Sequence, residues 1–356
     1  GVRIVLSVAN RETRPVIFGL TGTTLSAEES AFFHDVRPWG IILFARNIET
    51  RAQLRALTDD LRDRLGNDQL PIFIDQEGGR VARIKPPLVR RYPPAQVYGA
   101  LFGQDPEIGT EAAYLGAMLL AHDLNELGVT ANCAPCLDLA LPGMSNVIGD
   151  RAYGADGETV TQLASAFYGG LRAGGVVPVI KHLPGHGRAK VDSHHDLPVV
   201  DTDRATLEAN DFVPFRALND AAMGMTAHIV YSAIDEGTVS TLSRPLISDI
   251  IRNQIGFDGL LMTDDLSMNA LSGDFPQRTQ NALRAGCDII LHCNGDRDEM
   301  AAIAAALPSN MTGEAARRAA RVEAEIAGLS SCAETAMRER WGELVAHVFP
   351  EAQNTV

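Results

Sequence analysis

The chain has 356 residues, of which 46% are hydrophobic and 21% charged, and its formal net charge is −14. A chain of this length and composition buries a large core without disulfides or a structural metal, as one large domain or two average ones. The acidic balance argues against a nucleic-acid partner, because phosphate binding requires clustered lysine and arginine.

The cysteines are scattered and odd in number, which argues against a secreted disulfide framework. Cys133 and Cys136 have the C-x-x-C spacing of a redox or zinc half-site, but no second pair follows, so we expect buried packing thiols. No apolar run reaches roughly 18 residues, so no membrane span is expected. The start of the chain lacks a signal-peptide pattern, and we expect a cytoplasmic protein.

Short apolar runs bounded by turn residues predict strands along the whole chain. Most runs are continuously aliphatic, which is typical of parallel strands buried on both faces. The predicted strands are residues 15–20, 40–45, 71–75, 129–135, 177–181, 224–230, 259–264 and 288–293.

Amphipathic stretches between these runs predict helices. One of them, 242–256, has Pro245 near its first turn and Gly256 at its end, which are favourable helix-end residues. The predicted helices are residues 50–65, 106–128, 155–175 and 242–256, followed by an Ala-rich helical region at 297–327 and a further helical segment at 333–348.

Repeated strand–helix units of this number predict a single-domain (β/α)8 TIM-like barrel with extra C-terminal helices. The barrel is expected over about 15–295 and the helical extension over about 296–350, because no linker divides the chain. A doubly wound open sheet is the alternative, but the turn GLTGTTLS after the first strand is not a G-x-G-x-x-G phosphate turn.

Polar side chains recur where the predicted strands end. In a (β/α)8 barrel the working residues lie at the carboxyl ends of the strands and on the loops that follow. Surface charge placed at random would not favour that end. The residues at these positions are Asp75, Arg83, Asp150, Arg151, Lys181, His182, His228, Asp264, Asp265, His292 and Asn294.

Each of these residues also has an ordinary structural explanation. An ion pair between Asp75 and Arg83 would simply close a loop. Asp265 is suited to cap a helix over LSMNAL, because a carboxylate accepts the free amide hydrogens there. His228 lies inside a predicted strand and is expected to be a hydrogen-bonded core histidine. Only the joint placement of the polar residues indicates a functional site.

The segment KHLPGHGRAKVDSHH (181–195) contains four of the nine histidines. His182 and His186 have the spacing that places two metal ligands on one face of a helix. Pro184 and Gly185 disfavour a helix, so we expect a loop, and the helical argument for a metal site fails. Zinc bound by irregular backbone remains an alternative, because catalytic zinc needs only three protein ligands.

A second hypothesis for the same segment is proton transfer by the pair in Asp192-Ser193-His194. A carboxylate two residues before a histidine bonds one ring nitrogen, fixes the tautomer and leaves the other nitrogen for a ligand. The neighbouring glycines would let the loop close over that ligand and exclude water.

The block KHLPGHGRAKVDSHHDLP resembles the signature of glycoside hydrolase family 3, and more narrowly its bacterial single-domain β-N-acetylglucosaminidases of peptidoglycan recycling. GIILFARNI, IDQEGGRVAR, NVIGDRAYG, MTAHIVY and LLMTDDLSMNAL resemble the same group in the same order, from about residue 15 to about residue 295. Leu183 departs from the family pattern, because an aromatic residue is usual at this position. Arg188 and Lys190 in the loop are further departures.

This resemblance implies a retaining exo-glycosidase that needs no metal or cofactor. Asp264 would be the nucleophile, His194 the acid/base, and Asp192 the residue that orients His194. The implied substrate is terminal β-linked N-acetylglucosamine on GlcNAc-1,6-anhydro-MurNAc muropeptides. The positions implied to bind the sugar are Asp75, Arg83, Arg151, Lys181 and His182.

Two other functions stay open. Phosphorolysis at the same site is one, because a histidine repels phosphate less than a carboxylate does, and Arg188 or Lys190 would attract it. A sugar-binding barrel without catalysis is disfavoured, because Asp264 and the Asp192–His194 pair are both intact. We expect a small-molecule saccharide as partner, no nucleic acid or membrane partner, and a monomer, with a homodimer as the alternative.

Overall fold

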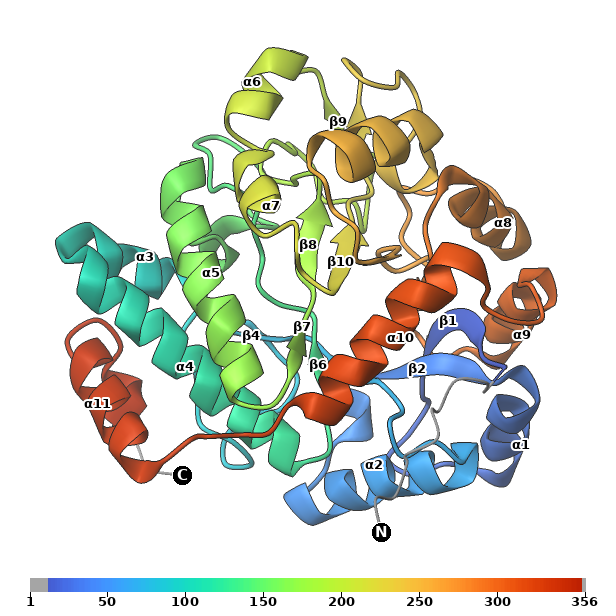
Figure 1. Cartoon of the computed structure of the whole chain (residues 1–356), viewed down its shortest axis with the longest axis horizontal. Helices are drawn as coiled ribbons and strands as arrows, with labels where there is room; N and C mark the ends of the chain where they lie inside the picture. Colours follow the sequence, from blue (N-terminus) through green and yellow to red (C-terminus); the bar gives the residue numbers. More distant parts are fainter. Residues whose placement is uncertain (1–11, 354–356) are drawn as a thin grey trace, which may run out of the picture.

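The computed structural model describes residues 12–353, and at their centre is a closed ring of parallel strands (Figure 1). Six strands follow the order β13-β1-β2-β3-β6-β7, and three follow the order β12-β10-β8. β8 continues the path of β7, so the two share one strand position in the ring. A parallel bridge from Met262 to Ile289 joins the remaining edges, and the closed ring has eight strand positions. The strands are β1 (Arg14–Gly19), β2 (Pro38–Leu43), β3 (Ile72–Ile74), β6 (Ala131–Asn132), β7 (Val177–Pro178), β8 (Ile180–Leu183), β10 (Met223–Thr226), β12 (Leu260–Met262) and β13 (Ile290–His292).

This closure confirms the predicted (β/α)8 barrel, because an open doubly wound sheet would leave two strand edges unpaired. Several strands are shorter than the apolar runs that predicted them. The run 129–135 pairs as a strand only at Ala131–Asn132, and Pro135 near its end has no amide hydrogen for the ladder.

Helices cover the outside of the ring, and three of the predicted ones begin and end within two residues of expectation. Polar caps start them: the Thr50 hydroxyl accepts the Gln53 amide hydrogen at 3.0 Å, and Asp156 accepts that of Thr159 at 2.9 Å. The helices up to residue 306 are α1 (Ala27–Val36), α2 (Arg51–Leu65), α3 (Ala95–Gln104), α4 (Pro106–Glu126), α5 (Gly157–Ala173), α6 (Arg204–Ala209), α7 (Val213–Ala217), α8 (Phe275–Ala285) and α9 (Arg297–Ala306), with a π-helix at Leu246–Gln254 in place of the α-helix predicted at 242–256.

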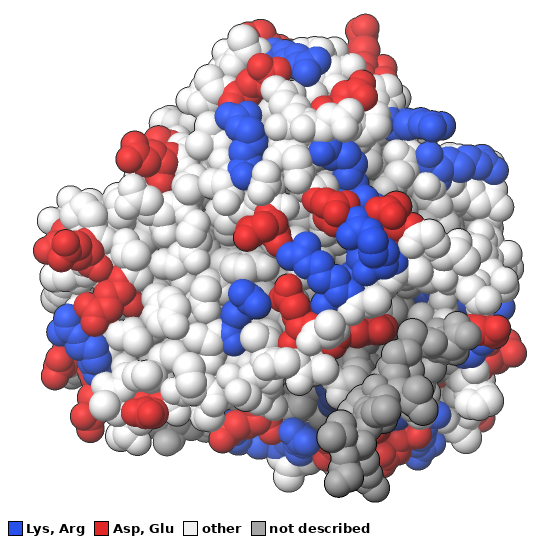
Figure 2. All heavy atoms as spheres, in the orientation of Figure 1, with Lys and Arg blue, Asp and Glu red and all other residues white. Residues whose placement is uncertain are grey.

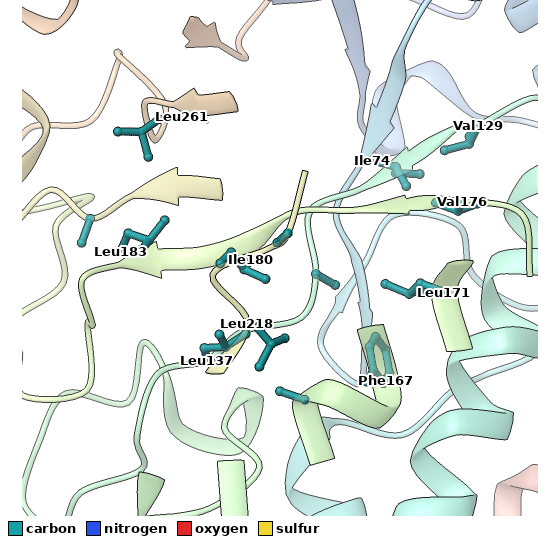
Figure 3. Close-up of a cluster of buried hydrophobic side chains, with 14 of the residues drawn as sticks. Ile74, Val129, Leu137, Phe167, Leu171, Val176, Ile180, Leu183, Leu218 and Leu261 are labelled. Atoms are coloured by element: carbon teal, nitrogen blue, oxygen red, sulfur yellow. The ribbon is translucent and has the colours of Figure 1, made fainter. Parts of the chain in front are cut away.

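The larger hydrophobic core lies between these helices and the outer face of the ring. Figure 3 shows Phe167 and Leu171 of α5 facing the strand path that carries Val176 and Ile180. Each of these side chains is at most 2% exposed. Burying an aliphatic or aromatic side chain to this degree contributes about 1.5–3 kcal/mol, so this layer holds the helices on the barrel.

A second core fills the inside of the ring, and α10 (Gly313–Gly328) closes its amino-terminal end (Figure 1). Val322 is buried against the barrel interior, and the Trp39 indole N–H donates to Glu323 at 2.9 Å. Figure 2 shows Lys, Arg, Asp and Glu side chains interleaved along this helix, where Arg318 pairs with Asp258 at 2.8 Å. This end of the barrel is therefore plugged, and the opposite end remains for chemistry.

The helical region predicted at 297–327 consists of two helices, α9 and α10, with a break between them. Leu307 is extended (φ −80°, ψ 150°), as expected for a residue before a proline, here Pro308. The break turns the chain from the outer helical layer to the amino-terminal end of the barrel. No helix among residues 12–353 is long and apolar enough to cross a membrane.

The last helix, α11 (Thr335–Val345), packs on α4 through Trp341, which is fully buried. The Trp341 ring lies 5.5 Å from the Tyr92 ring, so the C-terminal extension shares the main hydrophobic core of the barrel. We infer that barrel and extension unfold as one cooperative unit.

Trp341→Ala should lower the free energy of unfolding by about 3–5 kcal/mol, because a large cavity replaces a buried indole. Urea unfolding followed by circular dichroism measures this, with the exposed Glu339→Ala on the same helix as a control within about 0.5 kcal/mol of the parent. A separate early transition with an unchanged main transition would contradict the single cooperative unit.

Candidate active site

The residues selected from the sequence all lie at the carboxyl end of the barrel. Asp75 follows β3, Lys181 and His182 belong to β8, and Asp264 follows β12. The others lie on loops at the same end: Arg83 after the hairpin of β4 (Gln76–Gly78) and β5 (Val81–Ala82), Arg151 in a short 3-10 turn (Gly149–Arg151), and Asp192 and His194 on the loop after β8.

A network of ion pairs joins four of these side chains to Glu77, which was not predicted from the sequence. Lys181 Nζ lies 3.3 Å from Asp75 and 2.7 Å from Glu77. The Arg151 guanidinium binds both Glu77 oxygens, at 2.7 and 3.0 Å. At the other end of this network, Arg83 lies 3.4 Å from Asp75. Glu77 is therefore the central counter-ion of the candidate site.

Burial and charge act in opposite directions on this network. Burial alone would lower the pKa of Lys181, but Glu77 and Asp75 raise it above its ordinary value. Burial likewise would raise the pKa of Glu77, but Arg151 and Lys181 hold it well below its usual range. Lys181 and Glu77 are therefore both charged at neutral pH. Glu77 is engaged on both oxygens, whereas the longer contacts of Asp75 leave acceptor positions for a ligand's hydroxyl groups.

Arg83 is held against an aromatic ring that the sequence reasoning also passed over. Its guanidinium carbon lies 5.2 Å from the centre of the Phe44 ring, within the range of a cation–π contact. The Arg83 Nε is buried without a hydrogen-bond partner among the described residues. The guanidinium is thus oriented by Phe44 while much of its donor capacity remains unused.

Asp138 is a second missed carboxylate, and it positions two histidines. One oxygen lies 2.7 Å from His182 Nδ1, and the other accepts the backbone amide hydrogen of His186 at 2.7 Å. An ionised Asp138 accepts, so His182 Nδ1 is the donor and His182 Nε2 is left for a ligand. Burial would raise the pKa of Asp138, but His182 and His186 lower it to about 2.

The predicted metal alternative meets the same carboxylate. Cys136, Asp138 and His182 offer ligand atoms within 4.8 Å of one another. The three groups already satisfy each other, because the Cys136 thiol donates to Asp138 at 3.2 Å and His182 donates to the same oxygen. Burial raises the pKa of Cys136 well above its usual value, so the thiol keeps its proton. We interpret this group as a hydrogen-bonded support for His182, in line with the expected packing role of the cysteines.

Asp264 is half-buried just past the end of β12. One of its carboxylate oxygens accepts the backbone amide hydrogen of Asp265 at 2.8 Å. Burial would raise the pKa of Asp264, but His228, His182 and the Asp265 amide together lower it, with His194 adding to the effect. Asp264 is therefore an ionised carboxylate at neutral pH, which lies in the electrostatic field of the loop that carries His194.

His228 is the core histidine that its strand position predicted. It is fully buried, with Nδ1 2.6 Å from the Thr241 hydroxyl and Nε2 2.9 Å from the Asp265 carbonyl oxygen. Burial lowers its pKa, so the ring is neutral and Nε2–H donates to that carbonyl. The predicted helix after Asp265 is absent: residues 266–271 are turns, and Asp265 accepts the Ser267 amide hydrogen at 3.3 Å within them.

Asp192 and His194 form the pair that their spacing predicted. Asp192 Oδ1 accepts from His194 Nδ1 at 2.7 Å and from its backbone amide at 2.9 Å. Burial would raise the pKa of Asp192, but these two bonds lower it. The His194 side chain is 59% exposed, so its Nε2 faces open space. The pair thus has the geometry of an oriented acid/base histidine.

The loop that carries this pair, residues 183–196, is tied to the loop that follows Asp264. Ser193 is buried, and its carbonyl oxygen accepts the amide hydrogen of Ala270 at 3.2 Å. The Arg278 guanidinium in turn donates to the carbonyl oxygens of Leu266, at 2.5 Å, and Leu271, at 2.6 Å. His194 and Asp264 are therefore placed relative to each other through backbone anchors.

Three comparisons relate this arrangement to known proteins. Residues 18–324 match the model of the family described as "Glycosyl hydrolase family 3 N terminal domain". A beta-hexosaminidase of Alkalilimnicola ehrlichii is 42% identical over 284 residues, which are 79% of this chain and 80% of that protein. One of Bordetella avium is 39% identical with the same coverage.

Solved structures agree with these sequence relatives. NagZ of Neisseria gonorrhoeae, in complex with N-trifluoroacetyl-D-glucosamine, superposes with a TM-score of 0.84 at 30% identity, over 94% of this chain and 98% of that one. A family 3 beta-N-acetylglucosaminidase of a Paenibacillus species gives a TM-score of 0.82 at 31% identity, over 95% of this chain and 67% of that one.

Asp138→Asn should remove a pH-dependent contribution to stability. A carboxyl whose pKa is lowered on folding stabilises the fold above its unfolded pKa, and this contribution disappears as the pH falls from about 4 towards 2. The variant should lose about 1.5–3 kcal/mol at pH 7 and show a flatter pH dependence below pH 4. Urea unfolding at a series of pH values measures both quantities. The exposed Asp63→Asn is the matched control, and an unchanged pH slope in Asp138→Asn would contradict the role of Asp138.

Proposed function

The chain belongs to glycosyl hydrolase family 3 and is a β-N-acetylhexosaminidase, and from that premise we propose that it releases terminal β-linked N-acetylglucosamine from peptidoglycan fragments, with retention of configuration. GlcNAc-1,6-anhydro-MurNAc muropeptides are the proposed substrates. One observation carries the mechanism: an ionised carboxylate, Asp264, lies in the field of a histidine that a second carboxylate orients.

Asp264 is the proposed nucleophile. A retaining glycosidase forms a covalent glycosyl–enzyme, so its nucleophile must be an anion at working pH and must be held rigidly. The lowered pKa of Asp264 supports the first requirement. Its place at the end of β12 and its bond from the Asp265 amide support the second.

His194 is the proposed acid/base, with Asp192 as its positioning residue. With Nδ1 bonded to Asp192, His194 Nε2 gives a proton to the leaving oxygen and later takes one from water. An imidazole exchanges protons near neutral pH without a large shift of its pKa, unlike the carboxylic acid that most retaining enzymes use here. Asp192 also stabilises the imidazolium form when His194 holds two protons.

The proposed sugar site comprises Asp75, Arg83, Lys181 and His182. Asp75 accepts from hydroxyl groups, Arg83 has donor capacity that no described residue uses, and His182 Nε2, opposite the Nδ1–H that donates to Asp138, offers an acceptor. Lys181 is almost fully enclosed between its two carboxylates, so it orients Asp75 as well as offering one N–H. The location in the cytoplasm and the monomeric state remain predictions.

Arg151 takes a more indirect part than the sequence predicted. It binds both oxygens of Glu77, and its Nη1 donates to the Val147 carbonyl oxygen at 3.1 Å. We therefore propose that Arg151 fixes Glu77, and through it Lys181, while its remaining N–H groups face the ligand. Phosphorolysis has less support than the sequence suggested, because Arg188 is paired with Asp211 at 2.8 Å and the exposed Lys190 is left to attract phosphate.

Asp264→Asn should lower kcat on 4-nitrophenyl β-N-acetylglucosaminide by about 10⁴-fold or more, because the glycosyl–enzyme cannot form. Proton NMR of the first-formed anomer tests retention, and added phosphate tests for a sugar 1-phosphate product. The parent enzyme should release the β-anomer and no sugar phosphate. Hydrolysis by Asp264→Asn at the parent rate, or activity confined to a β-glucoside, would contradict the proposal.

His194→Ala should lower kcat by about 10²–10⁴-fold on substrates with a poor leaving group and much less on those with a very acidic one, because only the former need a proton. Rates on a series of aryl β-N-acetylglucosaminides of graded leaving-group acidity measure the difference. Asp192→Asn, which disturbs only the orientation, should show the same trend with a smaller loss. Equal losses across the series would contradict the acid role of His194.

A further inference from the structure

A narrow groove lies beside the proposed sugar site, between the hairpin of β4 and β5 and the Pro-rich loop 84–92. Its volume is about 230 Å³, comparable to one sugar or amino-acid residue rather than to a macromolecule. The residues of its lining that matter here are Gln76, Arg80, Lys85, Arg90, Arg91 and Tyr92.

The groove is basic in a chain that is otherwise acidic. Residues 79–104 contain five lysines and arginines and no aspartate or glutamate, although the whole chain carries a net charge of −14. Arg80 is neutralised by Asp150 at 3.0 Å. Lys85, Arg90 and Arg91 have no side-chain hydrogen bond or ion pair within residues 12–353, so three cations around one groove lack a counter-ion.

The loop that carries these cations is held rigidly at both ends. At one end the buried Gln76 side chain donates to the Ile84 carbonyl oxygen at 2.8 Å and accepts the Ile84 amide hydrogen at 3.1 Å. At the other end the Tyr92 hydroxyl donates to Asp123 at 2.6 Å, and the Tyr92 ring packs on Trp341. Cations on a fixed frame lose less conformational entropy when they bind a ligand than cations on a free tail.

The hairpin that walls the groove also supplies the sugar site. Asp75 precedes it, Glu77 lies within it, and Arg83 follows it. Gln76 joins the two sides, because its side-chain oxygen also accepts the Arg83 amide hydrogen at 2.8 Å. A ligand that reaches Lys85, Arg90 and Arg91 from the sugar site therefore has to pass over this hairpin.

We propose that this groove binds a carboxylate on the leaving-group side of the substrate. The inference rests on the proposed function, because a muropeptide carries lactyl or peptide carboxylates next to the sugar that is removed. Paired arginines favour carboxylates through bidentate hydrogen bonds. A long polyanion is disfavoured, because the groove is small and the acidic remainder of the surface repels it.

The test compares two substrates in the triple variant K85Q/R90Q/R91Q of the full chain. On a GlcNAc-anhydro-MurNAc peptide the variant should lose about tenfold in kcat/KM, mostly through KM, because three exposed charge contacts contribute modestly each. On neutral 4-nitrophenyl β-N-acetylglucosaminide its rate should stay within about twofold, because none of the three residues takes part in the ion pairs of the sugar site.

Two controls separate a specific site from a change in overall charge. The variant R55Q/R64Q/R204Q removes the same charge from exposed helix surfaces and should behave as the parent on both substrates. When the carboxylates of the peptide substrate are amidated, the kcat/KM of the parent enzyme on it should fall below that on the free-acid substrate.

The outcomes also separate this inference from the proposed function. If the parent enzyme hydrolyses neither substrate, the proposed function fails and the groove proposal falls with it. If the parent hydrolyses both and the K85Q/R90Q/R91Q variant loses equally on both or on neither, only the groove proposal is overturned.

Discussion

The buried cation Lys181 is the constraint on which the candidate site depends. Its side chain is 2% exposed, and it stays charged only because Glu77 and Asp75 flank it. Removing one partner of a buried ion pair typically costs about 3–5 kcal/mol, because the other charge is left uncompensated. The loop that follows β3 is therefore held in register with β8 by charge, although β6 lies between the two strands.

The ion pairs of Lys181 with Asp75 and Glu77 cross over β6, which is only a short strand. Its chain continues into Cys133, a small buried side chain that lies in the field of both Asp75 and Lys181. Burial, with Asp75 next, raises the pKa of this thiol well above its usual value, so it adds no charge to the network. A larger or ionised side chain at this position would disturb the pairing, which gives the expected packing role of the cysteine a specific purpose.

The sequence was sufficient for the strand–helix order and for the residues directly at strand ends. Asp75, Lys181 and Asp264 follow from one rule, that parallel strands in a barrel present their carboxyl ends together. Glu77 and Asp138 could not be recognised, because their partners are distant: Arg151 is 74 positions from Glu77, and His182 is 44 positions from Asp138. A carboxylate on a loop looks the same in sequence whether it faces solvent or a buried cation.

The departures from the predicted elements have local causes. The predicted helical region 297–327 divides after α9, because Pro308 disfavours a helical conformation for Leu307 before it. The helix expected after Asp265 does not form, because Arg278 takes carbonyl oxygens from the turns that occupy this segment. The same turns donate the Ala270 amide hydrogen to the Ser193 carbonyl oxygen. The segments that carry the proposed nucleophile and the proposed acid/base are therefore both attached to these turns. The barrel thus gives Asp264 a rigid position, while the exposed loop gives His194 access to a leaving group that differs from one substrate to another.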